Sequence, residues 1–437
     1  MLFGYHLKLA INSFWRNRWL TCQMILTIAF GISAWCATFS ALSSLSGDPL
    51  HGRGTNLYHP QVDPTPASIR EANASPPSNL TLRDARALYR AAPQNMRVMT
   101  SRNWLPVVLS LGGVNQSRMA ITRSTTADFF KLFRVPFLYG HGWSDAEGDA
   151  GQRVVVLSKK TNQQLFGGRN SVGSVIEIAT KPFVIVGVID QWEMIPRFYD
   201  LSDGAFASNE ELFIPFDTWL SLPQDYGYGP MVCWSNQEAD MDHNPESDTC
   251  TWVQLWVELQ GAGFEGYKSF LHNYSIDQRN LGRYTRPPNV RLPNALTWIK
   301  TNRAIPDSVR VQYWVANSLL LVCLMSTAVL MVVKFRGAYK EFGLRRALGA
   351  SSQAIFKQLI IEAGLIGLIG GIFGLIFSFF IMTILQRAPD GYASYITIHP
   401  SDLAISLFLS IATTVLAGVI PALRVSLNSP YRQLVDG

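Results

Sequence analysis

The sequence predicts an integral membrane protein with four α-helical spans, arranged as one plus three, and a large extracytoplasmic α+β domain between the first two spans. Three observations support this fold class. The mean hydropathy is slightly positive, at +0.12. Charged residues make up only 16% of the 437 residues, against roughly 25% in soluble domains. Four apolar runs are long enough to cross a hydrocarbon core about 30 Å thick as helices.

The four runs cover residues 20–45, 313–335, 355–385 and 403–425. The first run could instead be a cleaved signal peptide, with Phe39-Ser40-Ala41 as the small-residue cleavage region. Its apolar stretch is too long for a signal core. A transmembrane helix is therefore the favoured interpretation.

The distribution of Lys and Arg predicts the orientation of these spans. The amphipathic N-terminal segment 1–19 contains three cations and no acid, and residues 334–357 contain six cations and one acid. Short basic flanks remain in the cytoplasm, so both termini, including the tail 426–437, are expected inside and the loop 386–402 outside. Residues 46–312 hold 25 Lys plus Arg and 26 Asp plus Glu. The basic balance thus reflects membrane topology, and nucleic acid is not an expected partner.

The segment 46–312 is expected to form the external domain. Residues 50–78 are proline-rich and should be extended or loop, and residues 80–93 have helical spacing. Short β-branched runs then alternate with short helical segments, which indicates an α+β or α/β domain. An aromatic, acidic and proline-rich interval around 217–250 interrupts this alternation. We interpret it as an inserted subdomain.

Two cysteines, Cys233 and Cys250, lie in the external domain, while the other three lie in spans. Extracytoplasmic compartments favour disulfides, and closing this loop would stabilise the fold by about 3 kcal/mol. We therefore predict a Cys233–Cys250 disulfide. The alternative is a pair of free buried thiols.

No motif in the sequence supports an enzyme or a metal site. "GGRNSVGS" has Ser174 where a phosphate-binding loop needs lysine, so a turn between strands is favoured. "DMDHNPESD" resembles a calcium loop but has Pro245 where glycine is needed, so a solvated acidic loop is favoured. Neither HExxH nor GxSxG occurs. Several aromatic residues could line an apolar site, but ordinary core packing is the preferred explanation.

The third span carries two overlapping GxxxG pairs, Gly367/Gly371 and Gly370/Gly374, which predict close helix packing on adjacent faces. Glu362 lies near the start of this span. A buried carboxylate there would be costly and often functional. At the interface, Glu362 could instead snorkel to the headgroups or pair with a cation such as Lys357 or Arg346, and we favour this interfacial, structural interpretation.

Between the second and third spans lies the stretch "KFRGAYKEFGLRRALGASSQ", residues 334–353. Ser351 or Ser352 can cap the helix that follows, and Ile355, Phe356 and Leu359 share one face of it. The spacing predicts a short basic helix at the inner membrane surface that then turns into the bilayer.

Three stretches resemble one known family. "KEFGLRRALGASSQAIFKQLIIEAGLIGLIGGIFGL", "LFGGRNSVGSVIEIATKPFVIVGVID" and the closing "IPALRVSLNSPYRQL", together with the one-plus-three order of spans, resemble the MacB-type, FtsX-like (type VII) permeases of ABC transporters. By this resemblance the segment 336–354 is the coupling segment that docks on an ATPase. A lipid-headgroup anchor is the alternative. The coupling residues are then Lys340, Glu341, Gly343, Arg345, Arg346 and Gly349.

The resemblance implies a permease subunit in the cell inner membrane with its large domain in the periplasm. No GxxxxGK[ST] motif occurs, so the chain is not expected to be an enzyme or to hold a cofactor. ATP and magnesium would be bound by a separate ABC ATPase, present in two copies. The other implied partners are a second copy or a paralogous permease, a periplasmic adaptor and membrane lipid.

Three functions remain open at this point. The first is export of peptides, antibiotics or similar amphiphiles by mechanotransmission, in which ATP-driven movement reaches the external domain. The second is transmembrane signalling, or activation of a cell-wall hydrolase, without transport. The third is lipoprotein release. The sequence does not distinguish the substrates.

Overall fold

The computed structural model describes residues 13–46, 49–50, 52–69, 71, 74–111, 114–223, 229–234, 244–387, 392 and 395–427. The chain divides into two compact units. We call Met1–Gly47 together with Ile305–Gly437 the helical unit, and Asp48–Ala304 the sheet unit. Most of the N-terminal segment 1–19 and of the tail 426–437 lies outside the described residues, as do Asp240 and Asp242 of the acidic loop.

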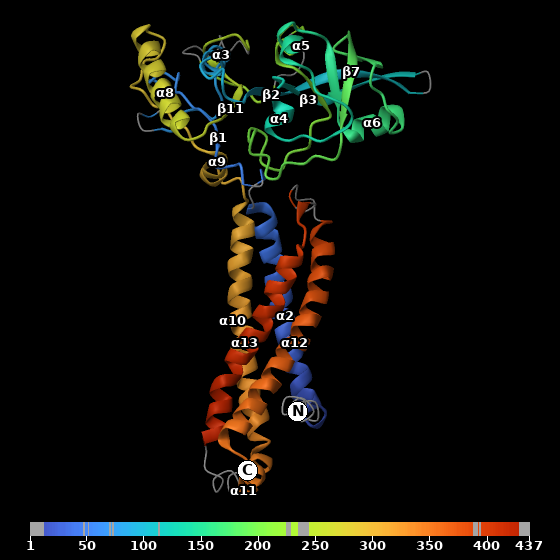
Figure 1. The fold of residues 1–437 in the computed structure, drawn as a ribbon, viewed down its shortest axis with the longest axis vertical. Coiled ribbons are helices and arrows are strands. Elements are labelled where there is room, and N and C mark those ends of the chain that lie inside the picture. Colours follow the sequence, from blue (N-terminus) through green and yellow to red (C-terminus); the bar gives the residue numbers. More distant parts are fainter. Residues whose placement is uncertain are drawn as a thin grey trace. The chain divides into compact units, whose positions relative to one another are not determined.

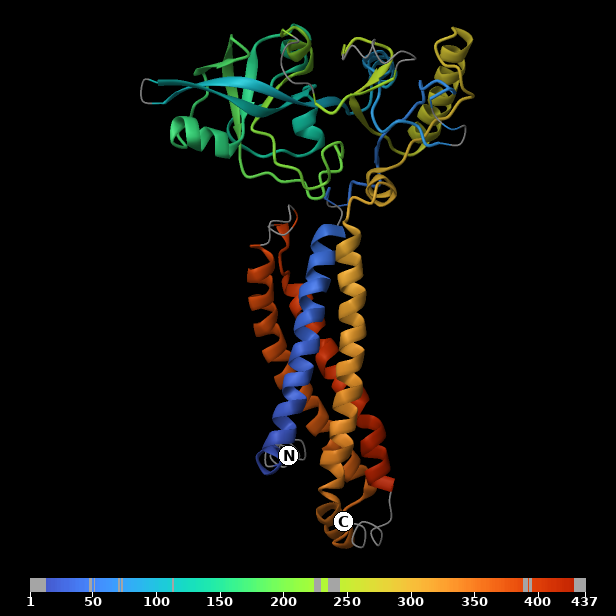
Figure 2. The ribbon, with the colours of Figure 1, turned by 180° about the vertical axis from the view of Figure 1, so that it is seen from behind.

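The helical unit contains four helices long and apolar enough to cross a membrane: α2 (Arg18–Ser46), α10 (Asp307–Arg336), α12 (Ser352–Leu385) and α13 (Pro400–Leu427). A shorter helix, α11 (Tyr339–Ala347), lies between α10 and α12 in the chain. Helices α2 and α13 each pack against both α10 and α12, forming a four-helix bundle (Figures 1 and 2). The core of the bundle at the α11 end is apolar and includes Met24, Met331 and Leu359.

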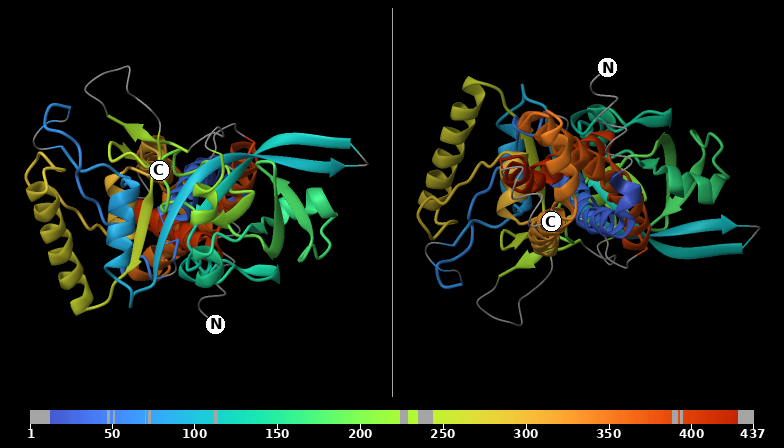
Figure 3. Two further views of the ribbon diagram at one scale, coloured as in Figure 1. Left: turned by 90° about the horizontal axis from the view of Figure 1, so that it is seen from above. Right: turned by 90° about the horizontal axis from the view of Figure 1, so that it is seen from below.

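The sheet unit is built on one nine-stranded mixed sheet. Its strands are β1 (Leu57–Tyr58), β2 (Arg97–Leu111), β3 (Val114–Thr125), β4 (Phe137–Gly140), β5 (Val154–Leu157), β6 (Val175–Ile178), β7 (Lys181–Ile189), β8 (Leu212–Pro215) and β11 (Gln254–Glu258). The order is β1-β11-β2-β3-β8-β5-β7-β4, and β6 pairs with β2 and β7. Strands β2 and β3 form a long hairpin that projects past its neighbours (Figure 3).

Short helices complete the sheet unit. They are α3 (Leu82–Arg90), α4 (Phe129–Leu132), α5 (Asp145–Asp149), α6 (Lys159–Phe166), α7 (Phe216–Leu220), α8 (Ala262–Asn280) and α9 (Ala295–Thr301). Side chains alternate along a strand, so the sheet has two apolar faces. Val155 and Leu157 of β5 join one core with α3 and α8, while Val154 and Val156 join the other with the aromatic residues of α4. Together with the four long helices, this architecture confirms the predicted fold class.

A buried ionic network crosses the second of these cores. Arg123 of β3 donates to Asp200 at 2.8 Å and to Glu210 at 2.5 and 3.1 Å, and all three side chains are at most 2% exposed. Arg197 and Tyr199 also donate to Glu210, at 3.1 and 3.0 Å. Burial disfavours the charged form of Glu210, but the neighbouring guanidinium groups outweigh burial and lower the pKa of Glu210 to about 2.

Acidification is expected to destabilise the sheet unit through Glu210. Because the folded pKa of Glu210 lies below its ordinary value of 4.5, its contribution to stability is complete above that pH and is lost as the pH falls toward 2. The shift corresponds to roughly 3 kcal/mol. Thermal unfolding of the detergent-solubilised chain between pH 7 and pH 3 should therefore show a steeper loss of melting temperature in the wild type than in Glu210→Gln. Equal slopes would contradict this expectation.

Candidate functional site in the helical unit

Helix α11 and its two flanking turns form the candidate site. Gly337 follows the last residue of α10, and α11 then runs to Ala347. Gly349 has φ +100°, a left-handed conformation that only glycine adopts without strain. Ser351 then caps α12 by accepting a hydrogen bond from the backbone N–H of Ala354 at 3.2 Å. The chain thus reverses sharply between α11 and α12, and Gly349 makes that turn possible.

One side of α11 is held by other parts of the chain. Glu341 accepts from Arg345 one turn later and from Arg16, which precedes α2. Arg345 also donates to Gln358 of α12 at 3.1 Å. Gly343 is buried on another face of α11. Of the expected coupling residues, Glu341 and Arg345 therefore make intramolecular contacts, and Gly343 is buried.

A neighbouring face of α11 carries an exposed stripe. Lys340, Leu344 and Leu348 recur every four residues and therefore share one helix face. Lys340 is exposed, and Leu344 and Leu348 are 57% and 80% exposed. Arg346 projects from a different face of α11 and is half-buried. Sequence reasoning missed the two leucines, because their spacing is visible in the sequence but the face of α11 that packs on the bundle is not.

A second group of polar side chains lies deeper in the bundle. Lys334 of α10 and Glu362 of α12 form an ion pair at 2.6 Å and are 2% and 3% exposed. Lys334 also donates to the hydroxyl of Thr21 at 2.9 Å, and Ser13 donates to Glu362 at 2.7 Å. The Lys334 ammonium lies 4.8 Å from the ring centre of Phe14.

This arrangement differs from the expected pairing of Glu362. Glu362 is buried in the bundle, and its ion-pair partner is Lys334 and neither Lys357 nor Arg346. Lys357 lies five residues earlier on α12, a rotation of about 140° around the helix, and is exposed on another face. Glu362 is ten residues into α12, roughly 15 Å along its axis, where the last turns of α10 bring Lys334 into reach.

The glycines of α12 allow close packing against two different helices. A Cβ atom on Gly367 would lie 2.8 Å from the backbone oxygen of Ser410 of α13, and one on Gly371 would lie 2.9 Å from Leu407. In contrast, Cβ atoms on Gly370 and Gly374 would lie 3.0 Å from Ile28 and from the backbone oxygen of Ala29, both in α2. One GxxxG pair therefore packs against α13 and the other against α2.

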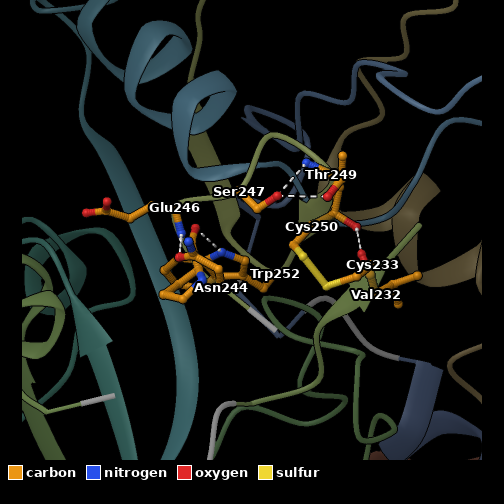
Figure 4. Close-up of a disulfide and its surroundings, with 10 residues drawn as sticks. Val232, Cys233, Asn244, Glu246, Ser247, Thr249, Cys250 and Trp252 are labelled. Carbon is orange, nitrogen blue, oxygen red and sulfur yellow. Dashed lines mark hydrogen bonds between the residues drawn. A yellow bond between two sulfur atoms is a disulfide. The ribbon is translucent and has the colours of Figure 1, made fainter. Parts of the chain in front are cut away.

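In the sheet unit, a disulfide joins Cys233 of β9 (Val232–Cys233) to Cys250 of β10 (Cys250–Thr251) (Figure 4). The two short strands form a separate two-stranded sheet, and Trp252 next to it donates to the Pro245 carbonyl at 3.0 Å. The rest of the interval 217–250 is described only in part, with residues 224–228 and 235–243 outside the described residues. In the described part of the chain, no group of three or more His, Cys, Asp or Glu side chains is placed to hold a metal ion.

Comparison with known proteins identifies the family. A family model described as the MacB-like periplasmic core domain matches residues 21–256, and one described as the FtsX-like permease C-terminal matches residues 315–430. A pyoverdine export ATP-binding/permease protein PvdT from Pseudomonas entomophila is 22% identical over 98% of this chain and 59% of its own length. A macrolide export ATP-binding/permease protein MacB from Photorhabdus laumondii is 25% identical over 70% of this chain and 42% of its own length.

The chain spans about half the length of the curated relatives it matches. The periplasmic region of MacB from Actinobacillus actinomycetemcomitans aligns with 58% of this chain and 95% of its own, at 16% identity and a TM-score of 0.35. The family assignment rests on the two family matches, the first of which covers more than half of the chain. The chain belongs to the MacB/FtsX-like family, with a MacB-like periplasmic core domain and an FtsX-like permease C-terminal region.

Proposed function

We propose that this chain is the permease subunit of an ABC exporter in the cell inner membrane. A separate ATPase subunit, present in two copies, binds ATP and magnesium and moves α11. The movement passes through the bundle to the sheet unit, which lies in the periplasm. The exported molecules are peptides, antibiotics or similar amphiphiles. The permease works with a second copy or a paralogous permease, and a periplasmic adaptor receives the substrate.

The single observation that carries this proposal is the pairing of a fixed face and an exposed face on α11. One face is tied to the bundle by Glu341 and Arg345, while the neighbouring face presents Lys340 and two exposed leucines. Exposed leucines outside the apolar spans indicate a partner surface. A purely lipid-anchoring segment would not need one face fixed by an ion pair to Arg16 and by a hydrogen bond to Gln358 of α12.

Aromatic residues at the start of α2 support the orientation with both termini in the cytoplasm. Trp15 and Trp19 are 77% and 81% exposed and flank Arg16 and Arg18 in the sequence. Tryptophan is enriched at membrane–water interfaces, and arginine is enriched on the cytoplasmic side. Helix α11 follows the basic end of α10 and lies on the same side.

Replacing Leu344 and Leu348 by aspartate is expected to abolish association with the ATPase. Two desolvated leucine contacts are lost and two charges are placed against the partner. The test is co-purification of the detergent-solubilised chain with a co-expressed ABC ATPase subunit from the same genome. The matched control is Leu281→Asp, since Leu281 is 72% exposed in the sheet unit. Unchanged association in the double variant would show that α11 does not dock on the ATPase.

A second measurement on the same complex distinguishes export from the two other functions, which are signalling or hydrolase activation and lipoprotein release. Hydrogen–deuterium exchange of the sheet unit should differ between the ATP-bound and ADP-bound complexes if the proposal is correct. An exchange difference accompanied by substrate export supports the exporter. The same difference without export of any tested amphiphile supports signalling or hydrolase activation. Release of lipoproteins from proteoliposomes supports the third function.

A further inference from the structure

Eight polar side chains at α11 and in the neighbouring part of the bundle form two layers, and we call them the polar ladder. The outer layer contains Arg16, Glu341, Arg345 and Gln358, and the inner layer contains Ser13, Thr21, Lys334 and Glu362. In the outer layer Gln358 is buried and the other three side chains are partly or fully exposed. In the inner layer Ser13 is half-buried and the other three side chains are buried. Among the described residues of the helical unit, Lys334–Glu362 is the ion pair in which both partners are buried.

The two layers share the same supporting segments. Ser13 and Arg16 lie three residues apart in the segment that precedes α2, and Gln358 and Glu362 lie four residues apart on one face of α12. Lys334 lies in the last turn of α10, just before the chain enters α11. A displacement of α11 therefore affects both layers. It moves Lys334 through the chain connection from α10, and it moves the segment before α2 and α12 through the contacts of Glu341 and Arg345.

Stability alone does not explain the inner layer. Charged residues within membrane spans are costly, and a buried ion pair can often be replaced by apolar side chains with little loss of stability. Apolar contacts between helices tolerate small sliding movements, whereas hydrogen bonds of 2.6 to 2.9 Å are lost when the partners move apart. The ladder therefore fixes α2 to the segments around α11 in a directional way.

We propose that the polar ladder transmits the movement of α11 to α2, the helix that leads directly into the sheet unit. This inference rests on the proposed function. The segment 13–17 connects the N-terminal end of α2 to α11 through Arg16 and to α12 through Ser13. Lys334 and Glu362 are positioning residues in this device, and the covalent link from α11 back to α10 is not the sole route of transmission.

The test compares the wild-type complex with the double variant Lys334→Met/Glu362→Leu, which removes both charges and leaves neither unpaired. The purified complex with its ATPase is assayed for association, ATP hydrolysis and the ATP-dependent exchange difference of the sheet unit. We expect association and hydrolysis to persist and the exchange difference to fall about tenfold, a typical size for coupling between sites. The charge-swapped variant Lys334→Glu/Glu362→Lys should recover part of the difference.

Two further variants complete the design. Arg16→Gln acts on the outer layer, where the Arg16 side chain is 51% exposed, so folding is not at risk. It should also reduce the exchange difference. Arg310→Met is the matched control, because Arg310 is 42% exposed at the other end of α10, and it should leave the difference unchanged.

The outcomes separate this inference from the proposed function. If the wild-type complex shows no ATP-dependent exchange difference, the proposed function fails. If the wild type shows it and both the double variant and Arg16→Gln retain it in full, the ladder does not transmit movement while the proposed function stands. If the double variant does not assemble with the ATPase, Arg16→Gln alone tests the inference: a reduced exchange difference supports transmission through the ladder, and an unchanged difference contradicts it.

Discussion

Replacing Arg123 by methionine is expected to lower the free energy of unfolding of the sheet unit by roughly 3–5 kcal/mol, the cost of removing one partner from a buried ion pair. Arg123 is fully buried, and its removal leaves the carboxylates of Asp200 and Glu210 without their main cationic partner. Arg197 still donates to Glu210 at 3.1 Å, but among the described residues Asp200 forms no ion pair other than the one with Arg123. The burial of these acids then opposes folding.

Denaturant unfolding of the detergent-solubilised chain, followed by near-ultraviolet circular dichroism, measures this loss. The matched control is Arg118→Met on the same strand, where Arg118 is 35% exposed and pairs with Glu211. Exposed ion pairs contribute about 0–1 kcal/mol, so the control should unfold close to the wild-type midpoint. Similar midpoints for both variants would show that the buried network does not stabilise the sheet unit.

Replacing Gly367 by alanine is expected to disrupt the packing of α12 against α13. The added Cβ would lie 2.0 Å from the Thr414 hydroxyl and 2.8 Å from the backbone oxygen of Ser410, which cannot turn aside. The helices must separate, and the hydrogen bond from the Ser410 hydroxyl to the Gly367 carbonyl, 2.7 Å long, is weakened. Overpacking of this kind costs about 1–3 kcal/mol or more.

The stability of the variant in detergent, measured by size-exclusion chromatography after heating, should therefore fall clearly. Gly364→Ala is the matched control on the same helix. Its Cβ would meet only Val415, at an ordinary 3.8 Å, and alanine favours helix over glycine. We expect Gly364→Ala to be as stable as the wild type. Equal losses in both variants would indicate a general intolerance of α12 and not a specific contact at Gly367.

Much of the local structure follows from the sequence. The apolar runs locate the four long helices, although α10 begins at Asp307, six residues before the expected span at 313. A helix continues past the apolar core wherever its polar turns can be hydrated, and hydropathy cannot detect that extension. The β-branched runs of β5, β6 and β7 and the helical spacing of α3 and α8 are also visible before folding.

The candidate site was only partly predictable. The sequence indicates a short basic helix before the third span, and the structure places α11 there. The sequence does not indicate that Glu341 and Arg345 face inward or that Leu344 and Leu348 face outward. Arg16 and Glu341 are 325 residues apart in the chain, and no local pattern relates positions at that separation.

The sequence by itself determined where the chain is apolar enough to span a membrane, where it turns, and which family it resembles. These properties depend on neighbouring residues and their hydration. Only the tertiary structure decided that Glu362 pairs with Lys334, that the two GxxxG pairs serve different helices, and that β11 inserts between β1 and β2. Such pairings depend on the relative rotation and register of elements distant in the chain, which are set by packing of the whole fold.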